Sequence, residues 1–126
     1  MKRALAALIA APLLLTGCSN YPDEISKPKQ LNKWIESAGY DCASWKENSD
    51  THAVCYLDGG DSLTVTITKE GDSPTNALPW YFDSPSIVGA VHGDNWFILC
   101  KESTMSKCGD IASAADVNYL PNPIYL

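Results

Sequence analysis

Basic residues are scarce in this chain of 126 residues, and arginine is nearly absent. The only Arg is Arg3, and beyond it seven Lys face fifteen Asp and Glu, which leaves a formal charge of −8 for that part. Proteins that bind nucleic acid need clustered Lys and Arg, because counterion release from the phosphates supplies much of their affinity. We therefore expect no nucleic-acid partner.

Long hydrophobic runs are also missing, apart from the uncharged stretch Ala4 to Leu15. Its twelve residues fall short of the roughly 20 that a membrane-spanning helix needs. Met1-Lys2-Arg3 gives the stretch a basic start, which is typical of an export signal. We expect residues 1–17 to be a signal peptide, which leaves 109 residues for a single domain.

The end of this signal carries Leu15-Thr16-Gly17-Cys18. These residues resemble the lipobox of bacterial lipoproteins, a likeness that covers about the first twenty residues of the chain. The resemblance implies that the sulfur of Cys18 takes a diacylglycerol and that acyl chains such as palmitate hold the protein on the extracytoplasmic face of a membrane. That membrane would be the plasma membrane of a single-membrane host, or the outer membrane of a two-membrane host, since Ser19 does not resemble the Asp retention signal. The alternative is an ordinary signal peptide in which the cysteine is incidental.

Residues 18–27 then form the lipidated N-terminus and a short tether, which reaches about 30 Å if fully extended. The tether contains Pro22, and its apolar residues do not follow the spacing of a helix or a strand, so we expect the folded domain to span residues 28–126. Because the tether is short, we expect this domain to stay close to the membrane.

Four further cysteines, Cys42, Cys55, Cys100 and Cys108, lie in the expected domain without any C-x-x-C spacing. In an oxidising compartment they are expected to form two structural disulfides. Three connectivities are possible. We favour Cys42 with Cys55 and Cys100 with Cys108, because each pair flanks a short polar segment that could turn the chain back.

Apolar periodicity predicts the secondary structure of the domain. The spacing of Leu31, Trp34, Ile35 and Ala38 indicates a helix over 28–38, and Trp34 on this stripe is expected in the core rather than on a ligand platform. Met105, Cys108, Ile111, Ala112 and Ala115 indicate a second helix over 103–115. Strands are expected over 40–45, 53–57, 62–68, 87–91 and 96–100, with the proline-rich tail lying along the sheet.

The pattern breaks over residues 69–86, where Pro74, Pro79 and Pro85 leave little room for a helix. We expect an ordered loop or a single turn here. It encloses Trp80-Tyr81-Phe82, three consecutive aromatic residues whose side chains diverge, so at least one is expected at the surface as a contact for a partner. The alternative is that the loop closes over the open face of the sheet.

This order of elements predicts an α+β fold, a small antiparallel sheet with two short helices on one face and two disulfides.

No metal site is expected, because His52 and His92 fall in predicted turns on different hairpins. Asp58 and Asp61 flank Gly59-Gly60 as turn formers. The sequence also lacks the hydrolase motifs Gly-x-Ser-x-Gly, Ser-x-x-Lys and His-Glu-x-x-His. We therefore expect a protein that is not an enzyme and has no cofactor.

Gly93 to Cys100, followed by a helix that carries Cys108, resembles a pattern in small uncharacterised lipoproteins of actinobacteria and their phages. The likeness covers about a third of the chain. It implies a monomeric envelope protein that binds an envelope or phage protein near the membrane, for example a prophage lipoprotein that blocks DNA entry by a second phage (superinfection exclusion). The alternative is a lipoprotein that binds an extracellular small molecule or an envelope polymer, with the aromatic run as a stacking platform.

Overall fold

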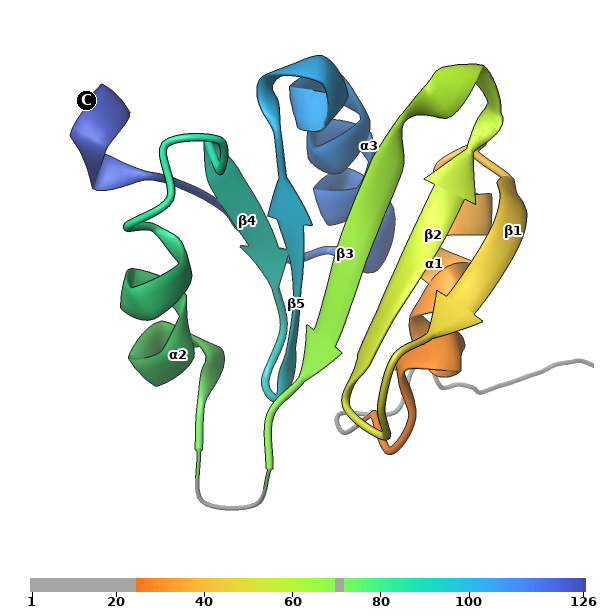
Figure 1. Ribbon diagram of the computed structural model, residues 1–126, viewed down its shortest axis with the longest axis horizontal. Helices are drawn as coiled ribbons and strands as arrows, with labels where there is room; N and C mark the ends of the chain where they lie inside the picture. The colour runs from red at the N-terminus through yellow and green to blue at the C-terminus, as the bar shows by residue number, and fades with distance from the viewer. Residues whose placement is uncertain (1–24, 70–71) are drawn as a thin grey trace, which may run out of the picture.

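A computed structural model describes residues 25–69 and 72–126, which form a six-stranded antiparallel sheet with helices on both faces (Figure 1). The strands lie side by side in the order β1-β2-β3-β5-β4-β6. Their bounds are Cys42–Glu47 for β1, His52–Leu57 for β2, Ser62–Ile67 for β3, Gly89–His92 for β4, Trp96–Cys100 for β5 and Tyr119–Pro121 for β6. The α-helices are α1 (Asn32–Ser37), α2 (Pro74–Tyr81) and α3 (Met105–Ala115), and 3-10 turns cover Pro28–Leu31, Asp58–Gly60, Glu102–Thr104 and Pro123–Tyr125.

The two helices expected from the sequence, α1 and α3, pack on the same face of the sheet. Trp34 of α1 is only 3% exposed, so its expected place in the core is confirmed. Strand β3 alternates as expected, since Leu63 and Val65 turn their side chains into this core. The α+β class with an antiparallel sheet is therefore confirmed.

The hairpin of β2 and β3 turns at Gly59 and Gly60, whose φ angles of +88° and +94° lie in the left-handed region that glycine adopts without steric cost. Another hairpin joins β4 and β5, and the tail adds β6 beside β4 through the pair Val91 and Tyr119. Both the hairpins and the placement of the tail along the sheet are confirmed.

The segment 69–86 is where the expectation is wrong, because Pro74–Tyr81 forms helix α2 on the opposite face of the sheet. Pro74 occupies the first helical turn, where no backbone N–H needs a partner, and Pro79 removes only one hydrogen bond from the helix interior. Burial offsets that loss: Leu78 and Phe82 pack against Ala90 and other side chains of β4 and β5.

Both favoured disulfides are confirmed. Cys42–Cys55 joins the edge strand β1 to β2 with its Cα atoms 5.2 Å apart. Cys100–Cys108 joins the end of β5 to α3, with a Cα separation of 6.3 Å. The bridges thus fix one edge of the sheet and the helix layer on it.

The chain enters the domain at Ile25, which is buried beside the β4–β5 turn. Its N–H donates to Asn95 Oδ1 at 2.9 Å, and Asn95 Nδ2 donates to its carbonyl at 2.7 Å. This two-way bond ties Ile25, the first residue that the structure describes, to the β4–β5 turn. Within the described ranges, no helix is both long enough and apolar enough to cross a membrane.

Candidate functional site

The three aromatic side chains at the end of α2 differ in how much of each is exposed to solvent. Trp80 is 74% exposed, Tyr81 is half-buried, and Phe82 is 7% exposed against the sheet. The expectation that at least one of them reaches the surface is confirmed. Because Leu78 and Phe82 hold the helix down on the sheet, Trp80 is displayed from an ordered element rather than from a loose loop.

Tyr81 ties this helix to the sheet. Its hydroxyl lies 3.2 Å from Nε2 of His52, at the start of β2, and its ring lies 5.3 Å from that of Phe97 with the planes at 61°. His52 Nδ1 in turn lies 2.9 Å from the hydroxyl of Thr51. The contact between Tyr81 and His52 spans 29 residues of sequence and sets the orientation of the helix end.

Trp80 and Tyr81 form an aromatic corner, the name we use for these two rings. Their centroids are 4.8 Å apart and their planes are nearly perpendicular, at 86°. The corner opens on a cavity of about 490 Å³, a size that suits a small ligand or a single side chain. The lining consists of Trp80, Tyr81, Asp83, Ser84, Ile87 and Leu99.

An uncovered strip of sheet lies beside this cavity. Val54, Thr64 and Leu99 stand in register on neighbouring strands, so they share the face on which α2 packs. Helix α2 covers β4 and β5, whereas Val54 and Thr64 remain half-buried and Tyr56 is 41% exposed (Figure 1). A partner seated on the aromatic corner could therefore extend over β2 and β3.

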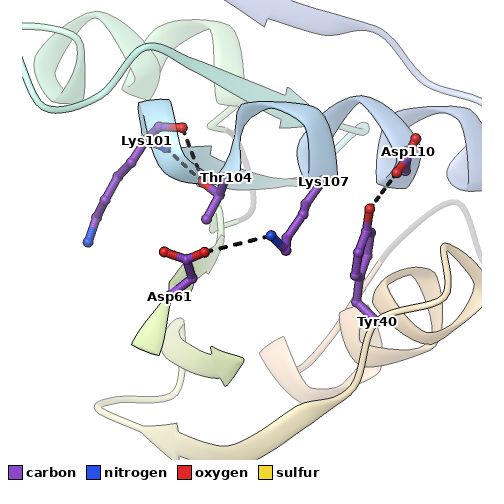
Figure 2. Close-up of polar contacts among 6 residues, drawn as sticks. All are labelled: Tyr40, Asp61, Lys101, Thr104, Lys107 and Asp110. Carbon is purple, nitrogen blue, oxygen red and sulfur yellow. Dashed lines mark hydrogen bonds and ion pairs between the residues drawn. The ribbon is translucent and has the colours of Figure 1, made fainter. Parts of the chain in front are cut away.

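A second polar cluster lies around α3, on the other side of the molecule (Figure 2). The Tyr40 hydroxyl donates to Asp110 Oδ2 at 2.5 Å, and Lys107 Nζ lies 3.6 Å from Asp61 Oδ2. The hydrogen bond to Asp110, then desolvation and the Asp110 charge, raise the pKa of Tyr40. These contacts fasten α3 to the segment after α1 and to the start of β3, so we assign them a structural role.

The two histidines lie at strand ends rather than in turns, which corrects their expected placement. His52 begins β2, and His92 ends β4 with Nδ1 3.2 Å from the carbonyl oxygen of Gly93. Asp61 is paired with Lys107, as described above, and Asp58 lies in the 3-10 turn. Among the residues that the structure describes, no three His, Cys, Asp or Glu side chains gather in a group that could hold a metal ion.

An apolar groove of about 860 Å³ lies at the far end of the sheet from Ile25, between the tail and the start of α3. Met105 and Tyr125 line it and are about half exposed. Met105 is the first residue of α3, within the helix expected from its spacing, and it contributes to this groove rather than to the core. The Tyr125 hydroxyl donates to the Pro85 carbonyl oxygen and holds one wall of the groove.

Sequence reasoning placed Trp80, Tyr81 and Phe82 in one candidate site but missed Asp83 and His52 beside them. The spacing of Leu78 and Phe82, four residues apart, together with Pro74 directly after Ser73, is the signal that indicates helix α2. Cys18 lies outside the described residues. Comparison of the chain with protein-family models, curated proteins and solved structures finds no match.

Proposed function

We propose that this protein is a non-enzymatic, lipid-anchored envelope protein that binds a partner protein near the membrane through the aromatic corner. The observation that carries the proposal is the 74% exposure of Trp80 on a helix fixed by buried neighbours. A rigid, exposed Trp loses little conformational freedom on binding and offers a large area for contact, which is why Trp is enriched among binding hot spots.

The short connection to the anchor supports a partner in or near the same membrane. Only six residues separate Cys18 from Ile25, a span of about 25 Å at full extension. Ile25 is held at the β4–β5 turn through Asn95. With acyl chains on Cys18, that end of the sheet lies next to the bilayer and the corner lies on the flank of the domain.

A specific form of this proposal is superinfection exclusion, in which the partner is an envelope or phage protein that takes part in DNA entry. Expression in a sensitive host tests it. Phage plating and DNA entry are expected to fall with the native chain and to recover with Trp80→Ala or Cys18→Ser. Unchanged plating and DNA entry with the native chain would reject the exclusion form.

Capture of an extracellular small molecule or an envelope polymer is the second candidate. The cavity of about 490 Å³ beside Trp80 favours it, because pockets for small ligands begin near 300 Å³. Binding of purified envelope polysaccharide or of small metabolites by the isolated protein, with no protein captured on intact cells, would favour this candidate over the first.

A further inference from the structure

We propose that the aromatic corner receives a cationic side chain, the ammonium of a Lys or the guanidinium of an Arg, on an exposed segment of the partner protein. This inference rests on the proposed function and names the chemistry by which the partner is recognised. It combines the geometry of the two rings, the charge beside them and the shape of the cavity.

The ring geometry fits a cation. A positive group is attracted to the face of an aromatic ring, most strongly to that of Trp, within about 6 Å of the centroid. The planes of Trp80 and Tyr81 stand at 86° with centroids 4.8 Å apart, and both residues line the cavity, so a group bound there lies next to both rings.

The charge of the cavity has the matching sign. Asp83 is the only charged residue in its lining and lies in the turn directly after α2. Ser84, one residue further on, adds a hydroxyl that can accept a hydrogen bond. The formal charge of −8 beyond Arg3 also favours the approach of a basic segment over that of an acidic one.

The lining of the cavity suits a long basic side chain. Leu99 and Ile87 supply apolar lining, against which the methylene stem of a Lys or Arg can pack while its charged end stays near Asp83. The uncovered strip on β2 and β3 leaves room for the backbone of the segment that carries this side chain.

The chain itself uses the same interaction at three other places. Lys29 lies 5.3 Å from the Trp45 ring, Lys33 lies 5.3 Å from the Trp34 ring, and Lys107 lies 5.8 Å from the Tyr40 ring. In contrast, no lysine of residues 25–69 or 72–126 lies over Trp80 or Tyr81. The corner therefore presents aromatic faces and a carboxylate to a cation from outside the described domain.

Binding of capped Lys peptides to the full-length exported protein, purified in detergent, tests the inference. The probes are a short peptide with one Lys, the same peptide with acetyl-lysine and the same peptide with Arg. Binding is followed by the NMR signals of the Trp80 indole and of the Ile87 and Leu99 methyl groups, which also line the cavity and remain when Trp80 is replaced. We expect the Lys and Arg peptides to shift these signals in a saturable way. The acetyl-lysine peptide is expected to bind about fivefold more weakly or not at all, the loss typical of a cation–π contact.

Four variants make the test specific. Trp80→Ala and Asp83→Asn are each expected to weaken Lys-peptide binding about fivefold, and added salt to weaken it further. The matched controls Ile124→Ala and Asp72→Asn, an exposed apolar side chain and an exposed carboxylate outside both the cavity lining and the uncovered strip, are expected to change it less than twofold, as surface substitutions usually do.

The inference is overturned if acetyl-lysine and Lys peptides bind equally, or if Asp83→Asn and Trp80→Ala leave Lys binding intact. It is also overturned if an N-acetylglucosamine oligosaccharide or phosphatidylcholine vesicles shift the Trp80 signal while the Lys peptide does not. The proposed function has a separate test, which is partner capture on cells. It is rejected if Trp80→Ala captures the partner as well as the native chain does, even where the Lys peptide binds the native protein as expected.

Discussion

The hydroxyl of Tyr81 lies 3.2 Å from Nε2 of His52, so helix α2 is hydrogen-bonded to the strand that begins at His52. Tyr81 is the direct neighbour of Trp80, and the two rings make a T-shaped contact. The hydrogen bond that holds Tyr81 therefore also helps to fix the position of the exposed indole. The candidate binding surface is therefore held by the sheet, although its most exposed residue makes little contact with the core.

Helix α2 depends on burial for its stability, so removing its core side chain is expected to be costly. Leu78 is fully buried against Phe97 and Leu99. Leu78→Ala should lower the free energy of unfolding by about 2–5 kcal/mol, as buried Leu→Ala substitutions do. Chemical denaturation measures this, with the exposed Asn76→Ala as the control, expected to change it by less than about 0.5 kcal/mol. Equal effects of the two substitutions would contradict the packing of α2 described above.

The disulfides are expected to supply a large share of the stability of this small domain. Replacing Cys42 and Cys55 together with Ala should lower the unfolding free energy by about 3 kcal/mol, because the bridge closes a loop with a separation of 13 residues. Replacing Cys100 and Cys108, which have a sequence separation of 8, should lower the unfolding free energy by about as much, since both side chains are fully buried. Unfolding curves that do not shift on either double substitution would reject this assignment.

The strands and the hairpins could be predicted because their signals are local, whereas the pairing of β3 with β5 could not. The alternation of Leu63, Val65 and the intervening Thr residues, the glycine turn after Asp58 and the spacing of the cysteines each follow from short-range geometry. Helix α2 could not be predicted in the same way. Its prolines oppose a helix locally, and the contact of Leu78 with Phe97 that outweighs them joins residues far apart in the sequence.

The candidate site was predicted only in part, for the same reason. The aromatic run at Trp80 is visible in the sequence, whereas His52 joins it through a contact across 29 residues. Asp83 lies in the turn after α2, and it lines the cavity together with Leu99 of β5, which is 16 residues away in the sequence.

The contact between Tyr40 and Asp110 predicts a pH dependence at the alkaline end. Folding raises the pKa of Tyr40 above 10.0, so the folded state holds this proton more tightly than the unfolded chain. The contribution to stability is complete below about pH 10 and is lost as the pH rises through the higher pKa of the folded state. Tyr40→Phe should remove it, so the stability difference between the native chain and this variant should shrink above pH 10.

Chemical denaturation at a series of alkaline pH values measures this difference. Asp110→Asn serves as the control, because it should bring the pKa of Tyr40 back toward 10.0 in a titration of the phenolate absorption. Tyr119, whose pKa is raised by burial, is present in both proteins, so its effect cancels in the comparison. A stability difference that stays constant across pH 10 would contradict the role assigned to Tyr40.

The proposed anchor predicts a change of location on a single substitution. Cys18→Ser removes the sulfur that would carry the diacylglycerol, and two acyl chains are about what stable membrane attachment needs. Cell fractionation should find the native chain in the membrane fraction and the variant outside it, with Ser19→Ala behaving like the native chain. Membrane attachment of Cys18→Ser equal to that of the native chain would reject the anchor.

The central claim is that Trp80 binds a partner without contributing to the fold. Trp80→Ala and the control Ile124→Ala, an exposed apolar side chain away from the corner and the uncovered strip, should be expressed on the envelope, with partner capture by cross-linking and the free energy of unfolding measured for each. We expect Trp80→Ala to lower capture about tenfold or more, as truncation of a hot-spot Trp does, while the unfolding free energy changes by less than about 0.5 kcal/mol. Ile124→Ala should not lower capture to this extent. Undiminished capture by Trp80→Ala, or loss of its fold, would contradict the account.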